Sequence, residues 1–394
     1  METIFTLENL FKAYKECQKG KKNTVNALEF ELHREKNLIR LLEELTSRRY
    51  EISRHICFIV THPTPREIFA ADFRDRIVHH LLCNEISGMF EADFITRSYA
   101  NRKGKGTHKA VEQVRSDTRR ARRGAGEGWY IKLDVQSFFR SIDKDLLFSL
   151  VEKKIASASG ASCQKMHWRE EVLWLARKII FHDPTKNYFY KGDPDKKSLI
   201  PKHKSLFYEN GKGLPIGNLT SQFFANVYLN ELDRFVTATL GVVSYVRYVD
   251  DFVLVCRSKG ELKSLITPID RFLEENLALR LHPGKVQLQE TRKGVDFLGY
   301  FIRPNYTLVR QKVVRRCKAR LREMLPAAGS NTHEGRKAAT GALPVLNSYY
   351  GHFGHARSFN LRKHLYLEHM GEMTGLFETD ETCCSLRLKL ISEG

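Results

Sequence analysis

The stretch Tyr-Val-Arg-Tyr-Val-Asp-Asp-Phe-Val at residues 245–253 sets two adjacent carboxylates between β-branched and aromatic residues. Short runs of Val, Tyr and Phe that are interrupted by polar residues are typical of a strand, a turn and a second strand. We therefore expect Asp250 and Asp251 at the tip of a tight hairpin. A divalent cation bound there would offset the repulsion between the two carboxylates. The alternative interpretation is a turn that simply favours Asp.

A third acid lies near the end of a stretch that alternates with period 2, residues 128–137 (Gly-Trp-Tyr-Ile-Lys-Leu-Asp-Val-Gln-Ser). The alternation predicts a strand whose apolar face carries Trp129, Ile131, Leu133 and Val135, and whose polar face carries Tyr130, Lys132, Asp134 and Gln136. A strand-end Asp combined with a hairpin Asp pair is what a two-metal phosphoryl-transfer site requires. Such a site holds two Mg²⁺ ions about 3.5–4 Å apart with hard oxygen ligands.

Successive segments of the chain resemble the motifs of reverse transcriptases, and they occur in the order of that family. The segments are Asp134 with Phe139, residues 213–222 (Gly-Leu-Pro-Ile-Gly-Asn-Leu-Thr-Ser-Gln), 248–251 (Tyr-Val-Asp-Asp) and 297–300 (Phe-Leu-Gly-Tyr). Upstream, Arg66 with residues 74–78 resembles the fingers motif, and residues 98–104 resemble the next one. The resemblance runs from about residue 55 to 300. It implies an α+β right-hand polymerase with fingers, an antiparallel-sheet palm and a helical thumb.

The resemblance also implies a role for each matching residue. Catalysis and metal binding fall to Asp134, Asp250 and Asp251, which would hold two Mg²⁺ ions, or Mn²⁺ as a substitute, with the Val135 carbonyl as a further ligand. The residues expected to bind the incoming dNTP are Arg66, Phe138, Phe139, Ile216, Gly217 and Lys285. Within this set, Phe139 would close off the sugar 2′ position and Lys285 would protonate the departing pyrophosphate, unless it is only a surface lysine after a turn. The residues expected at the template and primer are Arg102, Lys103, Gln222, Phe297, Leu298, Gly299, Tyr300, Arg315 and Arg316.

One motif departs from the majority pattern of the family. Retroviral and group II intron enzymes usually have Gln where this chain has Ile216, followed by Gly217 and, further on, Ser221-Gln222. The Ile form resembles the reverse transcriptases of diversity-generating retroelements. Those enzymes make adenine-mutagenic cDNA from a template-repeat RNA and work with a small basic accessory protein, usually a pentamer. Ile offers the nucleotide no hydrogen bond, so we expect weaker discrimination between paired and mispaired nucleotides; the alternative is a simple packing role for Ile216.

The net charge of +19 and the pI of about 9.5 predict a polyanionic partner. The basic residues form two clusters. The first contains Arg102, Lys103, Lys105, Lys109, Arg115, Arg119, Arg120, Arg122 and Arg123, with Glu112 and Asp117 as its only acids. The second contains Arg310, Lys312, Arg315, Arg316, Lys318, Arg320 and Arg322, and its spacing suits a helix face that follows a phosphate backbone. A solvated charged helix or an acidic protein partner are the alternatives.

The cysteines and the apolar runs predict a soluble, reduced protein. The eight cysteines show no Cys-x-x-Cys spacing with His that would indicate zinc, and no disulfide framework is indicated. No apolar run reaches the roughly 18 residues of a membrane span, and the N-terminus lacks a signal-peptide core. We therefore expect a cytoplasmic protein, encoded by a bacterium or a phage.

The hydrophobic spacing predicts helices over residues 5–17, 24–46, 74–89, 168–180, after Ser221, and 260–277 with a kink at Pro268. The expected domains are a helical N-terminal extension (1–54), fingers (55–128), a palm (129–303) with an irregular excursion (152–212), and a helical thumb with a C-terminal tail (304–394). The aromatic and His residues of 347–356 would either pack on a template-primer duplex or fill the thumb core.

Three rival functions are open at this point. The first is another group II intron-like or phage-defence reverse transcriptase, although an intron enzyme usually adds further segments after the thumb, for which residues 304–394 leave little room. The second is an RNA-dependent RNA polymerase, which must admit a ribose and is disfavoured by the bulky Phe139. The third is a non-catalytic RNA-binding scaffold, which would be expected to have lost one of the three acids.

Overall fold

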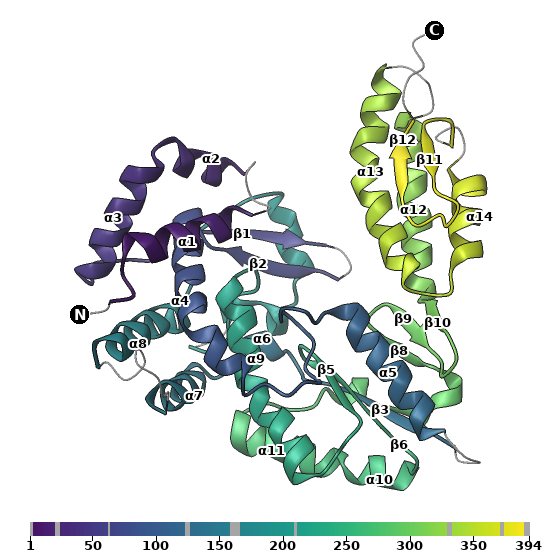
Figure 1. The fold of residues 1–394 in the computed structure, drawn as a ribbon, viewed down its shortest axis with the longest axis horizontal. Helices are drawn as coiled ribbons and strands as arrows, with labels where there is room; N and C mark the ends of the chain where they lie inside the picture. Colours follow the sequence, from purple (N-terminus) through teal and green to yellow (C-terminus); the bar gives the residue numbers. More distant parts are fainter. Residues whose placement is uncertain are drawn as a thin grey trace. The chain divides into compact units, whose positions relative to one another are not determined.

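The computed structural model of this chain describes residues 3–19, 24–61, 64–122, 127–157, 166–208, 211–328, 333–370 and 374–389, without the side chains of 325–328 and 333. Arg123 of the first basic cluster and Cys163 lie outside these ranges. The chain divides into two compact units, and Figure 1 labels their helices and strands. Unit 1 comprises residues Met1–Arg102, Leu133–Phe252 and Ser264–Val286, and unit 2 comprises Lys103–Lys132, Val253–Lys263 and Gln287–Gly394. The boundaries of the four expected domains remain a prediction.

Unit 1 begins with three helices, α1 (Leu7–Gln18), α2 (Val25–Leu32) and α3 (Arg34–Thr46). The helix expected over residues 24–46 is therefore wrong in one respect, because it is interrupted at His33, which has φ −130° and ψ 38°. The apolar residues of α1 pack against α4 (Phe73–Glu91), whose buried positions include Ile77, Leu81 and Leu82. The expected core helix over residues 74–89 is thus confirmed.

A three-stranded sheet follows, in the order β2-β1-β4. Strand β1 (His55–Val60) pairs antiparallel with β2 (Arg66–Ala70) and parallel with β4 (Tyr188–Tyr190). Between β3 (Trp129–Asp134) and β4 the chain forms the helices α6 (Phe138–Ser141), α7 (Lys144–Ala156) and α8 (Met166–Phe181). Helix α8 confirms the helix expected near residues 168–180, whereas β4 and the short 3-10 turns after it were not expected in the irregular excursion.

The sheet that carries the acids has the strand order β5-β6-β3-β7. Its strands are β5 (Tyr245–Tyr248), β6 (Asp251–Cys256), β3 (Trp129–Asp134) and β7 (Gln287–Glu290), and β3 pairs antiparallel with β7. The expected hairpin and the expected strand 128–137 are both present. The expected polar face of β3 is wrong at Tyr130, which is fully buried and donates its hydroxyl to the Gly294 carbonyl at 3.0 Å.

The expected amphipathic helix after Ser221 is α9 (Leu219–Arg234), which continues into a π-helical turn at Phe235–Thr239. The single kinked helix expected over residues 260–277 is wrong. The structure has α10 (Lys259–Ser264) and α11 (Ile266–Leu277) instead, with Pro268 in the first turn of α11. Proline is tolerated in that turn because the backbone N–H that it lacks would have no intrahelical partner there.

Unit 2 contains α5 (Thr107–Ala121) and a three-stranded sheet in the order β10-β9-β8. The strands are β8 (Val295–Phe297), β9 (Tyr300–Ile302) and β10 (Thr307–Val309). The C-terminal part of unit 2 consists of α12 (Gln311–Ala328), α13 (His333–Gly354), α14 (Phe359–His369) and a hairpin of β11 (Phe377–Thr379) and β12 (Leu386–Leu388). The helices were expected, and the hairpin was not.

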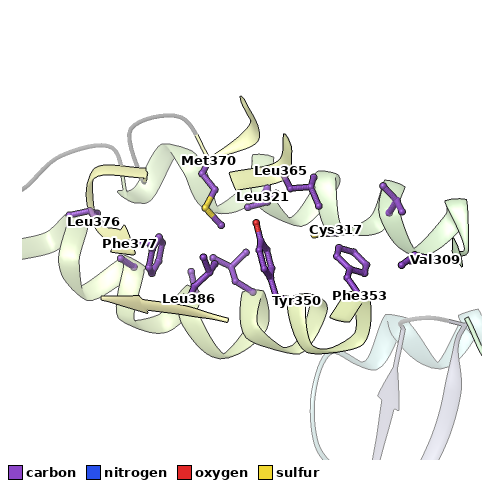
Figure 2. Close-up of a cluster of buried hydrophobic side chains, with 14 residues drawn as sticks. Val309, Cys317, Leu321, Tyr350, Phe353, Leu365, Met370, Leu376, Phe377 and Leu386 are labelled. Atoms are coloured by element: carbon purple, nitrogen blue, oxygen red, sulfur yellow. The ribbon is translucent and has the colours of Figure 1, made fainter. Parts of the chain in front are cut away.

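Tyr350 and Phe353 fill the core between these C-terminal helices (Figure 2). Both side chains are fully buried, together with Cys317, Leu321 and Leu365. Of the two roles considered for the aromatic segment 347–356, the structure thus supports the core role for these two rings.

No helix in the described part of the chain combines the length and apolar composition needed to span a membrane. The described cysteines are free thiols.

Candidate active site

The hairpin of β5 and β6 presents the two adjacent acids at its tip. Strand β5 ends at Tyr248 and β6 begins at Asp251, so Val249 and Asp250 form the turn. Val249 has φ 57°, a left-handed backbone conformation that β-branched residues avoid. A residue is held in such a conformation only when its surroundings over-determine it.

A buried ion pair behind the turn provides that support. The Arg247 side chain is 1% exposed, and its Nε and Nη2 atoms donate to Oδ1 and Oδ2 of Asp233 on α9, both at 2.6 Å. Its Nη1 donates to the Val249 carbonyl at 3.1 Å. Sequence reasoning did not single out Arg247, although a charged residue in the middle of an apolar strand was a signal for a buried partner.

Three further contacts complete this network within unit 1. Arg247 Nη2 also donates to Ser98 Oγ at 3.0 Å, and Nη1 donates to Asn226 Oδ1 at 3.2 Å. The Tyr245 hydroxyl donates to Asp233 Oδ1 at 2.7 Å. Burial, reinforced by the Asp233 charge, raises the pKa of Tyr245 well above its ordinary value. The turn is therefore anchored to α9 and to the segment that contains Ser98.

Asp134 lies beside this hairpin at the end of β3. Its side chain is almost fully buried, and its Oδ1 and Oδ2 accept hydrogen bonds from Lys285 Nζ at 2.8 and 2.9 Å. The Asp134 carbonyl accepts from the His282 N–H at 2.8 Å, and the N–H of Val135 donates to the Asp250 carbonyl at 3.2 Å. Backbone hydrogen bonds thus join the strand end, the hairpin tip and the turn that carries Lys285.

The three acids share one electrostatic environment. Burial, together with the charges of Asp134 and Asp251, raises the pKa of Asp250 to about 6, and the Lys285 charge opposes this shift. A cation bound among the three carboxylates would relieve this repulsion, and oxygen-only donors suit Mg²⁺. Among the described residues, no three His, Cys, Asp or Glu side chains are arranged as in a ligated metal centre, and Lys285 is the cation at Asp134. The donor chemistry fits Mg²⁺, and binding would require the Lys285 ammonium to move off Asp134.

The aromatic pair after Asp134 lies on α6. The rings of Phe138 and Phe139 are 5.4 Å apart; Phe138 is buried, and Phe139 is half-buried. The Phe139 carbonyl accepts from the Leu214 N–H at 2.7 Å. Phe139 is therefore tied to the loop that carries Ile216, whereas the structure places Phe138 in the core.

That loop is fixed against β2. The Ile216 carbonyl accepts from the Phe69 N–H at 2.9 Å, and Asn218 Oδ1 accepts from the Ala71 N–H at 3.0 Å. Gly217 has φ 124°, and a Cβ there would lie 2.8 Å from Cγ2 of Ile68, so only glycine fits. Ile216 is half-buried.

The residues expected at the template and primer fall into different places. Gln222 is exposed on unit 1 and Lys103 on unit 2; Arg66, which was expected at the dNTP, is also exposed on unit 1. Arg102 is an internal brace, because its guanidinium donates to Glu91 Oε2 at 2.8 Å and to the Ile95 and Ser98 carbonyls at 2.6 and 3.0 Å. Its charge and donors are used inside the protein, so this geometry speaks against the template contact expected for it.

In unit 2, Leu298 and Gly299 form the two-residue turn between β8 and β9, with φ 51° and 87°, as a tight hairpin requires. Phe297 and Tyr300 on either side are buried, and the Tyr300 hydroxyl donates to the His352 carbonyl at 2.8 Å. Only the tip of this motif is accessible to a primer. On α12, Arg315 is exposed and Arg316 is half-buried.

Comparison with known proteins gives a family match over most of the chain. The family described as Reverse transcriptase (RNA-dependent DNA polymerase) matches residues 63–302. Protein YkfC of Escherichia coli (strain K12) is 24% identical over 294 residues, which cover 66% of this chain and 69% of that protein. The group II intron-encoded protein LtrA of Lactococcus lactis subsp. cremoris is 20% identical over 293 residues, which cover 59% of this chain and 43% of LtrA. A telomerase structure from Candida albicans is similar at 11% identity with a TM-score of 0.47, covering 82% of this chain and 60% of the telomerase chain.

Proposed function

Because the chain belongs to the reverse transcriptase family, we propose that it synthesises cDNA on an RNA template with the three acids of the hairpin and β3 as its catalytic residues. Its fold class is the expected α+β right-hand polymerase. The observation that carries the proposal is the position of Asp134, Asp250 and Asp251: their charges act on one another, and Asp134 accepts a hydrogen bond from the Lys285 ammonium. Two Mg²⁺ ions bound to these carboxylates, with the Val135 carbonyl as a further ligand, would activate the primer 3′-hydroxyl and stabilise the pyrophosphate.

Lys285 contributes a mobile positive charge to this mechanism. In the structure its ammonium neutralises Asp134, and its side chain is about half exposed. Cations bound to the carboxylates would take over this neutralisation, and we assign the Lys285 ammonium to protonating the departing pyrophosphate. General-acid catalysis of this kind typically contributes about 10²–10⁴-fold in rate.

Phe139 and Ile216 provide the nucleotide selection. The half-buried Phe139 ring is held by a backbone hydrogen bond to the 214–218 loop, and Ile216 lies on that same loop. We assign Phe139 to the exclusion of a 2′-hydroxyl. Ile216 presents only an apolar surface where a Gln would offer hydrogen bonds, which supports low fidelity and hence the diversity-generating subtype with its template-repeat RNA and basic accessory protein.

A second candidate is a group II intron-like enzyme with ordinary fidelity. It is favoured by relatives whose names place them with introns, among them LtrA and the nuclear intron maturase 1 of Arabidopsis thaliana, the latter 21% identical over 304 residues. This chain matches 40% of the maturase and 43% of LtrA. Their whole-protein activities therefore carry over only as this alternative.

Sequencing of the cDNA separates the two candidates. The wild-type protein and Ile216→Gln copy one RNA containing all four bases, with and without the accessory protein. The diversity-generating subtype predicts wild-type errors concentrated at template adenines and fewer of them in Ile216→Gln, because each 1.4 kcal/mol or so of lost discrimination costs about tenfold in fidelity. Low, evenly distributed errors in both libraries would favour the intron-like candidate, and no extension at all would contradict the polymerase proposal.

A further inference from the structure

A basic and aromatic segment of unit 1, residues 186–208, has no part in the catalytic arrangement described above. It contains six lysines against two acids, Asp193 and Asp195; the lysines are Lys186, Lys191, Lys196, Lys197, Lys202 and Lys204. Residues 191–199 and 201–204 are all exposed. The segment therefore carries a concentrated positive charge on an accessible surface.

The segment is anchored along its length. Strand β4 adds to β1, where Tyr188 lies opposite His55, and the Lys191 N–H donates to the Cys57 carbonyl at 2.8 Å. Near the other end, the half-buried Glu67 carboxylate accepts from Ser205 Oγ at 3.0 Å and from the Leu206 N–H at 2.8 Å. These contacts give the segment a defined surface rather than that of a free loop.

Its aromatic residues divide between an inner and an outer face. On the inner side, Tyr188 packs against Phe207 and Phe69, with ring centroids 5.1 and 6.2 Å apart respectively. On the outer side, Phe189 is 51% exposed and Tyr208 is 60% exposed. Neighbouring β4 residues point to opposite faces, which is why Phe189 faces solvent while Tyr188 does not.

A cation lies beside each of the accessible rings. The Arg54 guanidinium is 5.6 Å from the centroid of Phe189, Lys202 Nζ is 5.7 Å from Tyr208, and Lys197 Nζ is 4.3 Å from Tyr190. Exposed aromatic rings and neighbouring cations are the two components of a single-strand binding surface. The rings stack on bases, and the cations bind phosphates.

We infer that residues 186–208 bind single-stranded RNA. The exposed rings favour a single strand over a duplex, whose bases are already stacked and paired, and the excess of lysines favours a polyanion over an ordinary protein surface. The identification of the strand as RNA rests on the proposed function. The inference that this surface binds a single-stranded nucleic acid rests only on its exposed rings and lysines. The strand is either the template ahead of the primer or an RNA segment that flanks the copied region.

The test measures binding of the full chain to a labelled single-stranded RNA and to an RNA duplex of the same length, without primer or dNTPs. The variants are Phe189→Ala/Tyr208→Ala for stacking and Lys196→Gln/Lys197→Gln for charge. The matched control is Phe11→Ala/Lys15→Gln, an exposed aromatic–lysine pair on α1 in which Phe11 is 42% exposed and Lys15 Nζ is 5.1 Å from its ring.

The aromatic variant should bind single-stranded RNA about fivefold or more weakly per lost stacking contact. The lysine variant should lower the slope of log K against log salt by about 1.4, at about 0.7 per phosphate contact. The control should match the wild type, and duplex binding should change less than single-strand binding in every variant. Wild-type affinity in both variants, an equal loss in the control, or an equal loss for the duplex would each overturn the inference.

Primer extension then identifies the strand. If extension by the variants is impaired on a template with a long 5′ overhang and normal on one with a short overhang, the bound strand is the template. Impaired RNA binding with normal extension on both assigns it to flanking RNA. Because binding is measured without synthesis, a protein that binds the RNA but extends no primer would contradict the proposed function while leaving this inference standing.

Discussion

At the scale of single residues, Val249 shows how the chain fixes the turn that carries Asp250. A β-branched residue with φ 57° is strained, by about 1–3 kcal/mol for such backbone conformations. The Arg247 guanidinium donates a hydrogen bond to the Val249 carbonyl. The same guanidinium also donates to Asp233, Asn226 and Ser98. The position of Asp250 and Asp251 therefore depends on the ion pair between Arg247 and Asp233.

Arg247→Met should reduce both stability and activity. Breaking one side of a buried pair leaves the Asp233 carboxylate without its charge partner, which typically costs about 3–5 kcal/mol. Urea unfolding measures the stability loss, and primer extension measures the activity at a temperature where the variant remains folded.

The control for Arg247→Met is the double variant Arg247→Met/Asp233→Asn. Asn removes the unpaired charge and keeps an acceptor for the Tyr245 hydroxyl, so about 1–2 kcal/mol of stability should return. Activity should remain low, because the Val249 carbonyl still lacks its donor. Recovery of activity in parallel with stability would reduce Arg247 to a purely structural residue.

Phe139→Ala should admit ribonucleotides, because removing the ring opens space beside the sugar. Single-nucleotide incorporation of dNTP and rNTP gives the two values of kcat/KM, and their ratio should move toward unity. Phe138→Leu is the matched control, since that neighbouring ring is buried in the core. An unchanged ratio in Phe139→Ala would remove the assigned role.

At the scale of elements, the sequence predicted what local patterns determine. The alternation of residues 128–137 and the adjacent acids at 250–251 gave a strand and a hairpin in the right places, and α4, α8 and α9 followed from their apolar spacing. The break at His33 and the separate α10 and α11 were missed, because apolar spacing continues across both interruptions while the backbone does not.

Pairings over long sequence distances could not be predicted. One partner of Arg247 is Ser98, which is remote in the sequence. Strands β1 and β4 pair in parallel although they are also far apart in the sequence. Neither has a local signature, since a parallel strand pair carries no turn and a buried guanidinium carries no motif. The internal contacts of Arg102 were missed for the same reason: its charge was visible in the sequence, and the carbonyls that accept from it were not.

A group of histidines links three elements of unit 1. His55 of β1, His79 of α4 and His182 line a cavity of about 10 Å³ that also borders Leu214 and Asn218. Burial, with a smaller effect from the neighbouring imidazole of His182, lowers the pKa of His55 to about 4, and burial lowers that of His79 to about 3. The folded protein keeps both rings neutral where the unfolded chain would protonate them.

Acid should therefore reduce the contribution of these two histidines to stability, whereas the raised pKa of Asp250 acts in the opposite direction. From pH 6.5 down toward pH 4, the unfolded state binds more protons than the folded state at these two histidines, so the free energy of unfolding falls as pH falls. His79→Leu should reduce this slope by about 1.4 kcal/mol per pH unit. Urea unfolding between pH 5 and 7.5 measures the slope, and the exposed His33→Leu serves as control; equal slopes in the wild type and His79→Leu would contradict this account.

At the scale of the whole molecule, the net charge of +19 is distributed over both units. Unit 1 carries the lysine-rich segment 186–208, and unit 2 carries the basic helices α5 and α12. Binding of a nucleic acid should therefore depend on Lys and Arg residues outside the acid cluster. This separation allows chemistry and binding to be tested independently of each other.

We expect Asp134, Asp250 and Asp251 to perform the chemistry and to contribute little to RNA binding. Asp250→Ala should abolish cDNA synthesis in Mg²⁺ and leave RNA affinity within about twofold of the wild type, because phosphate contacts come from Lys and Arg. Asp145→Ala, an exposed acid in the first turn of α7, is the control and should remain active. Primer extension and filter binding on the three proteins decide the matter: lost synthesis with retained binding is the predicted result, and substantial extension by Asp250→Ala in Mg²⁺ would contradict the account.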